Sequence, residues 1–94
     1  MATYRVIAWK GIPAGVEAQD GPDSATVELS ERFQMLIDSV AMQRGLHGSD
    51  EYLDSWTHGE PQDRAGTARE VADAVAADLE NRFAEFAARA FTIA

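Results

Sequence analysis

The N-terminal segment carries large apolar side chains on both faces of an extended strand. Because side chains alternate along a strand, Tyr4, Val6 and Ala8 fall on one face, and Ile7 and Trp9 fall on the other. A strand with one face in water normally alternates apolar and polar residues, so we expect this strand to be covered on both sides. A chain of 94 residues buries only a little over ~60% of its unfolded surface. The strand therefore constrains the fold, because either the rest of the chain or another polypeptide must cover it.

The residues that follow predict a β-hairpin. Residues 10–15 contain two glycines and Pro13, a combination that is typical of a turn. Residues 16–19 form a weaker second strand that ends at the turn-forming residues 20–23. We therefore expect an antiparallel hairpin over residues 3–20, and such a hairpin needs helices or further strands to be stable in water.

The pattern changes from strand to helix at Ser24. From this residue the apolar side chains repeat about every 3.6 positions and form a stripe on one helical face. Ser24 is suited to the N-cap and Gly45 to the position after the last turn. The pattern predicts a helix over residues 24–44.

Two more helices are predicted in the second half of the chain. A short helix is expected over residues 50–58, with Ser49 as its cap and a glycine after its end. Thr67 and Glu70 have the spacing of a capping box. They mark the start of a long, alanine-rich helix over residues 67–90.

These elements predict a single α+β domain over residues 1–94. An N-terminal antiparallel β-hairpin is expected to pack against two longer α-helices and one short helix. The core is expected to contain the apolar residues Val6, Ile7, Phe33, Leu36, Ile37, Val40, Leu53, Trp56, Val75, Leu79 and Phe83.

The charge and composition of the chain exclude several classes of function. Eight basic and 16 acidic residues give a net charge of −8, so the positive charge that drives binding to nucleic acid or an anionic membrane is missing. The absence of cysteine excludes disulfide and thiolate chemistry. The apolar run at the N-terminus is shorter than the ~7 residues that a signal peptide needs. We therefore expect a cytoplasmic protein with no nucleic-acid or membrane partner.

The acidic segment 47–60 suggests one chemical alternative. Asp50, Asp54 and His58 are four residues apart, so on a helix they would share one face, and carboxylates with an imidazole can hold a divalent transition metal. The helix dipole explains the same pattern without a ligand, because it favours acids in the first turn and a histidine in the last. This structural explanation is the simpler one, and we assign no metal, cofactor or catalytic residue from the sequence.

The hairpin loop is the candidate interaction site. Trp9, Lys10, Ile12 and Pro13 bring an aromatic, a cationic and two apolar groups together on a stiff turn, and aromatic anchors are enriched in protein interfaces. The alternative is that Trp9 and Ile12 pack on the chain's own helices, because large apolar residues are usually in the core. The exposed edges of a hairpin also favour self-association or strand pairing with a protein partner.

Three segments carry a resemblance to a known family. The first is Tyr4-x-Val6-Ile7-x-Trp9-Lys10-x-Ile12-Pro13-Ala14; the second is Glu28-Leu29-Ser30-Glu31-Arg32-Phe33-Gln34 with Ile37-Asp38 and Ala41-Met42; the third is Tyr52-Leu53-x-x-Trp56. Over residues 3–60 the chain resembles the small bacterial proteins called the virulence factor family. The resemblance implies no defined activity, cofactor or catalytic residue. Because some members are encoded near folate- and corrinoid-dependent methyl-transfer enzymes, it also implies an accessory role in one-carbon metabolism.

Two functions of different classes follow. The first is a non-catalytic protein-interaction or accessory subunit of a bacterial enzyme system, which contacts its partner through the hairpin and its loop. The alternative is a small metal- or cofactor-binding enzyme component that uses segment 47–60. We consider an enzyme the less favoured of the two.

Overall fold

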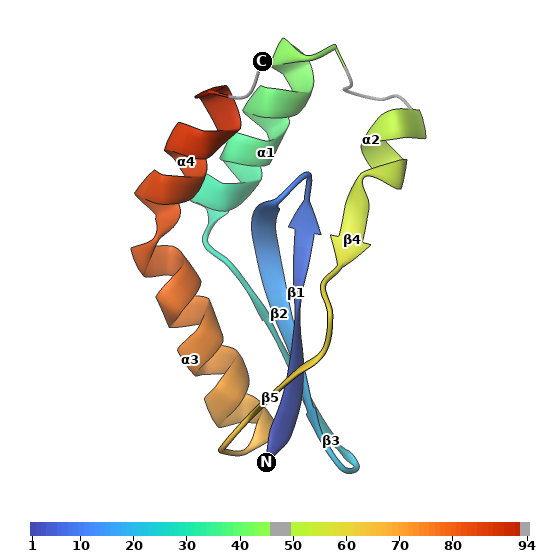
Figure 1. The fold of residues 1–94 in the computed structure, drawn as a ribbon, viewed down its shortest axis with the longest axis vertical. Coiled ribbons are helices and arrows are strands. Elements are labelled where there is room, and N and C mark those ends of the chain that lie inside the picture. Colours follow the sequence, from blue (N-terminus) through green and yellow to red (C-terminus); the bar gives the residue numbers. More distant parts are fainter. Residues whose placement is uncertain (46–49, 93–94) are drawn as a thin grey trace.

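An antiparallel sheet forms one layer of the molecule, and helices cover one of its faces (Figure 1). The computed structural model describes residues 1–45 and 50–92. In chain order the elements are β1 (Ala2–Trp9), β2 (Ile12–Asp20), β3 (Asp23–Glu28), α1 (Glu31–Gln43), α2 (Asp50–Asp54), β4 (Trp56–His58), β5 (Gln62–Arg64), α3 (Ala68–Asn81) and α4 (Phe83–Thr92). The α+β class and the N-terminal hairpin predicted from the sequence are confirmed.

The sheet is larger than the predicted hairpin. Its strand order is β3-β2-β1-β4, and β5 also pairs with β1. The β1–β2 turn is tight: Lys10 and Gly11 both have positive φ, 47° and 84°, which is the two-residue geometry that suits the twist of a hairpin. Ala14 is an extra residue in β2, because Ile7 pairs with Gly15 and Ala8 with Pro13. This bulge bends the end of the hairpin.

The predicted helix over residues 24–44 is wrong over its first two turns. Residues 23–28 form β3, which pairs with β2 along its length. The helix α1 starts at Glu31, with Ser30 as its N-cap in place of Ser24. The predicted end is confirmed, since α1 stops at Gln43 and Gly45 follows with a φ of 70°.

The predicted short helix over residues 50–58 is also shorter. It ends at Asp54, and Trp56–His58 form β4 on the edge of β1. Ser49 and His47 lie outside the described residues.

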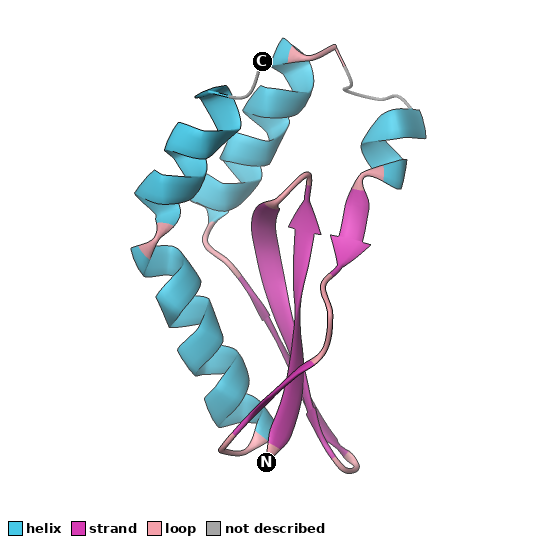
Figure 2. Ribbon diagram, viewed as in Figure 1, coloured by secondary structure: helices cyan, strands magenta, loops and turns pink. Residues whose placement is uncertain are grey.

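The predicted helix over residues 67–90 is divided in two. Its start is confirmed, because Thr67 and Glu70 form the capping box. The helix then breaks at Arg82 into α3 and α4. Both lie with α1 on the same side of the sheet (Figure 2).

The core lies between the sheet and these three helices. Of the residues expected there, Phe33, Leu36, Ile37, Val40, Val75 and Leu79 are buried, whereas Val6, Ile7, Trp56 and Phe83 are half-buried. Leu53 was expected in the core but is 65% exposed. The reason is that α2 has only five residues and turns Tyr52 toward the core. None of the helices in the described part of the chain is long and apolar enough to cross a bilayer.

Candidate functional site

The predicted interaction loop lies mostly inside the core. Trp9, Ile12 and Pro13 are buried, and only Lys10 is exposed. The indole Nε1 of Trp9 donates a hydrogen bond of 2.8 Å to the carbonyl oxygen of Tyr52. The structure therefore shows the packing alternative for Trp9 and Ile12. Binding of a partner by this loop stays a prediction, and among its four residues only Lys10 offers an exposed side chain.

The acidic segment does not form the helical face that its spacing predicted. Asp50 and Asp54 lie on α2, but His58 lies on β4, where its Nε2 is 3.5 Å from the Oε1 of Glu17. The helical prediction fails because backbone pairing with β1 holds residues 56–58 in an extended conformation. Within residues 1–45 and 50–92, no group of three histidine, aspartate or glutamate side chains is placed to hold a metal ion.

The sheet face turned away from the helices is a candidate functional surface. We call it the open face. Pairing and alternation place on it three residues from each long strand: Thr3, Arg5 and Ile7 from β1, Gly15, Glu17 and Gln19 from β2, and Ser24, Thr26 and Glu28 from β3. Ile7 is the one large apolar side chain among these nine residues, and Trp9, which follows it on the same side of β1 by alternation, is fully buried. The open face is therefore polar, as a water-facing sheet surface should be, except around Ile7.

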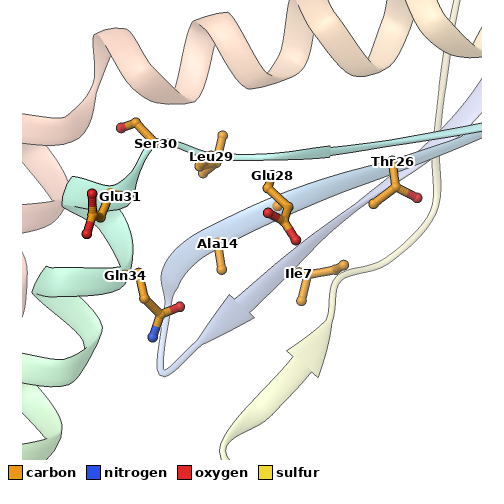
Figure 3. Close-up of a pocket in the computed structure, with 9 residues that line it drawn as sticks. Ile7, Ala14, Thr26, Glu28, Leu29, Ser30, Glu31 and Gln34 are labelled. Atoms are coloured by element: carbon orange, nitrogen blue, oxygen red, sulfur yellow. The ribbon is translucent and has the colours of Figure 1, made fainter.

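A hollow of about 500 Å³ lies beside Ile7 (Figure 3). Its lining consists of Ile7, Ala14, Gly15, Thr26, Glu28, Leu29, Ser30, Glu31 and Gln34. Gly15 keeps it open, because a Cβ there would come within 3.9 Å of the Ile7 Cδ1 and 3.3 Å of the Val27 carbonyl oxygen. The side chains of Ile7, Ala14 and Leu29 make part of the lining apolar, and we call this part the floor of the hollow.

The rim of the hollow is acidic. Glu28 ends β3 and Glu31 starts α1, and both are exposed. The lining contains no lysine, arginine or histidine. The hollow therefore combines an apolar floor with negative charge, which suits a side chain that has an apolar stem and a cationic end.

A hydrogen-bonded cluster fixes the rim at the start of α1. The carboxylate of Glu80, on α3, accepts hydrogen bonds from the Ser30 N–H (2.6 Å), from the Ser30 hydroxyl (2.8 Å) and from Arg32 (3.1 Å). Partial burial raises the pKa of Glu80, but the Ser30 hydrogen bonds and the Arg32 charge lower it by more, so this pKa lies below its usual range. Ser30 thereby holds the connection between β3 and α1 in place.

The sequence interpretation missed most of this site. The sequence predicted only that the apolar side chains on both faces of β1 need to be covered. Ile7, one of these side chains, is half-buried on the open face. Glu28 was not singled out as a site residue because residues 24–28 were assigned to a helix, and Gly15 was assigned only to the turn over residues 10–15. The alternation of Ala25 and Val27 with Thr26 and Glu28 was the available signal for β3.

The comparison with protein families gives one result. The sequence profile described as "Virulence factor" matches residues 7–90. The chain belongs to the virulence factor family. The match extends the resemblance seen over residues 3–60 to include α3 and most of α4, and every residue that lines the hollow falls within it. Comparisons with curated proteins and with solved structures find no match.

Proposed function

We propose that this virulence factor family member is a non-catalytic interaction or accessory subunit of a bacterial enzyme system, and that it binds its protein partner through the open face of the sheet. The family resemblance suggests folate- and corrinoid-dependent methyl transfer as the class of enzyme system. The proposal requires a surface that the fold itself leaves uncovered, and the hollow at Ile7 supplies one.

The observation that carries the proposal is the position of Ile7. It is the large apolar side chain of the open face, it is half-buried, and the hollow opens directly beside it. Protein interfaces typically have an apolar centre within a polar rim. Ile7, Ala14 and Gly15 supply such a centre, and Thr26, Glu28 and Gln34 supply polar groups around it. A partner side chain in the hollow would cover the part of β1 that the chain leaves accessible.

The lining chemistry favours binding over catalysis. Its polar side chains are the carboxylates of Glu28 and Glu31, the hydroxyls of Thr26 and Ser30, and the amide of Gln34. A general base that works near neutral pH is most often a histidine, and the lining contains none. These groups are suited to hydrogen bonds with a partner.

The substitution Ile7→Thr tests the proposal. Threonine keeps the β-branched shape that suits a strand but removes apolar surface from the hollow, so the amount of partner that co-purifies from the native bacterium should fall about tenfold. Affinity purification with quantitative mass spectrometry measures this amount. The control is Met42→Thr on α1, which removes an exposed apolar side chain (68%) away from the lining. Circular dichroism should show that both variants are folded.

Two results would contradict the proposal. One is that the Ile7→Thr variant co-purifies with as much partner as the unaltered protein does, because the hollow is then not the docking site. The other is the absence of any protein enriched over an unrelated acidic domain of the same size.

A further inference from the structure

Strand β3 forms an edge of the sheet. It pairs with β2 on one side, and no strand in the described part of the chain pairs with its other side. The Leu29 N–H donates to the Ala14 carbonyl oxygen at 2.9 Å, so the odd-numbered residues of this segment direct their backbone groups to β2. In an antiparallel ladder the direction alternates. The N–H and C=O groups of Ser24, Thr26 and Glu28 therefore point out of the sheet, where a further strand would pair.

One end of this edge is closed by the chain itself. Ser30 is the next outward-pointing residue, and its N–H donates to the carboxylate of Glu80. A Glu80 oxygen thus occupies the place that a partner strand's carbonyl would take. The open part of the edge is limited to residues 24–28, which lie beside the hollow (Figure 3).

The two sides of β3 differ in chemistry. On the open face, Thr26 and Glu28 are exposed and Glu31 follows on the rim. On the helix-covered face, Ala25 and Val27 are partly buried and pack against the core. Because side chains of a paired strand continue the two faces, an added strand would place alternate residues beside negative charge and beside apolar side chains.

A second copy of the chain fits this edge poorly. Because Ser24, Thr26 and Glu28 point outward, antiparallel pairing of β3 with itself would place Thr26 opposite Thr26 and Ser24 opposite Glu28. Each copy carries a net charge of −8, and this charge opposes the close approach of two copies. The charge instead complements a basic partner.

We propose that the occupant of this edge is an extended segment of a partner protein in which basic and apolar residues alternate, and that it adds to the sheet as a strand beside β3. The inference rests on the proposed function, since it names the partner's chemistry. The apolar side chains extend the core next to Ala25 and Val27. The basic side chains lay their stems toward the Ile7 hollow and place their charges near Glu28 and Glu31. Backbone pairing supplies affinity, and the alternation supplies specificity.

Synthetic peptides provide the direct test. Three peptides of about eight residues, the length of a typical strand, are titrated into the ¹⁵N-labelled full chain. The first alternates lysine and valine, the second replaces each lysine by glutamate, and the third has the composition of the first with all lysines before all valines. We expect the first peptide alone to shift the amide resonances of Ser24, Thr26 and Glu28 and to slow their hydrogen exchange, and its affinity should fall as salt increases.

Matched variants separate strand addition from general charge attraction. Thr26→Pro removes an outward N–H and leaves the ladder with β2 intact, since proline is tolerated at such edge positions. It should weaken binding of the lysine–valine peptide about tenfold or more, which corresponds to about 1.4 kcal/mol, whereas Thr26→Ala keeps the outward N–H and should weaken binding less. The double variant Glu28→Gln and Glu31→Gln should also weaken binding. The control Asp54→Asn removes an exposed charge on α2, away from the lining, and should leave binding unchanged.

Several outcomes overturn the inference. Binding of the lysine–valine peptide that Thr26→Pro leaves unaltered, or equal binding of the block peptide, shows charge attraction without strand pairing. Shifts of the β3 amides that depend on protein concentration without peptide identify a second copy as the occupant. If the peptide does not bind but Ile7→Thr still lowers the amount of co-purified protein partner, the edge inference fails and the proposed function stands. If neither test is positive, both fail.

Discussion

Trp9 connects the hairpin to the second half of the chain. Its side chain is fully buried, its ring centre lies 5.4 Å from that of Tyr52, and its Nε1 bonds to the Tyr52 carbonyl oxygen. The ring therefore holds α2 against β1 in addition to filling the core. A tryptophan at a hairpin turn suggests an interface anchor from the sequence alone, but here it serves the fold.

Substitution of Trp9 should reduce stability. We expect Trp9→Ala to lower the free energy of unfolding by about 3–5 kcal/mol, because it leaves a large cavity, as measured by urea denaturation. Trp9→Phe keeps most of the apolar volume but removes the hydrogen bond to the Tyr52 carbonyl oxygen, so it should lower this free energy by about 1 kcal/mol. If Trp9→Phe is as stable as the unaltered protein, this hydrogen bond contributes nothing to stability.

At the scale of elements, the start of α3 is fixed by its cap. The Thr67 hydroxyl oxygen accepts the Glu70 N–H at 3.1 Å, and the Glu70 carboxylate accepts the Thr67 N–H at 3.0 Å. The backbone and side chain of Thr67 also hold the pKa of the Glu70 carboxyl below its usual range. This was the most accurate sequence prediction of a boundary, because a capping box is a local signal.

The cap makes a separate stability prediction. Thr67→Ala removes the hydroxyl acceptor and should lower the free energy of unfolding by about 1 kcal/mol, measured by urea denaturation followed by circular dichroism. Thr67→Ser keeps the acceptor and serves as the control. Equal stability of the alanine and serine variants would show that the hydroxyl does not stabilise the helix.

Other element boundaries depend on contacts that the local sequence does not contain. Leu29 and Phe33 are four residues apart, so the helical pattern of α1 continues backward in the sequence, and only pairing with β2 makes residues 23–28 a strand. The break at Arg82 has no proline or glycine to mark it. It lets Phe83 and Phe86 both pack on Phe33, at 4.9 Å and 6.1 Å between ring centres. Tertiary packing overrides local propensity at both places.

At the scale of the whole molecule, the candidate site is formed by segments that register brings together. The excess apolar surface of β1 was predictable, because a two-sided apolar strand is visible in the sequence. The hollow was not, since it needs Gly15 opposite Ile7 and Glu28 opposite Gly15 across three strands. The charge of the rim also depends on where α1 begins, which the Ser30–Glu80 contact determines.

The same contact makes the stability of the molecule depend on pH. The pKa of Glu80 is lowered in the folded protein, so its ionised form stabilises the fold at pH values above the ordinary glutamate pKa of about 4.3. This contribution is lost as the pH falls through that value toward the folded-state pKa, because the folded protein must then bind a proton that the unfolded chain binds more readily. Neutralisation of the other carboxylates changes the net charge at the same time and would obscure a single measurement.

The comparison of two proteins isolates Glu80. Glu80→Gln keeps the shape of the side chain but removes its titration, so at pH 7 it should lower the free energy of unfolding by about 1–2 kcal/mol. This difference from the unaltered protein should shrink as the pH is lowered from about 5 to 3, while the charge changes common to both proteins cancel. Urea denaturation at several pH values measures the difference. A difference that stays constant across this range would mean that the Glu80 charge does not hold α1 to α3.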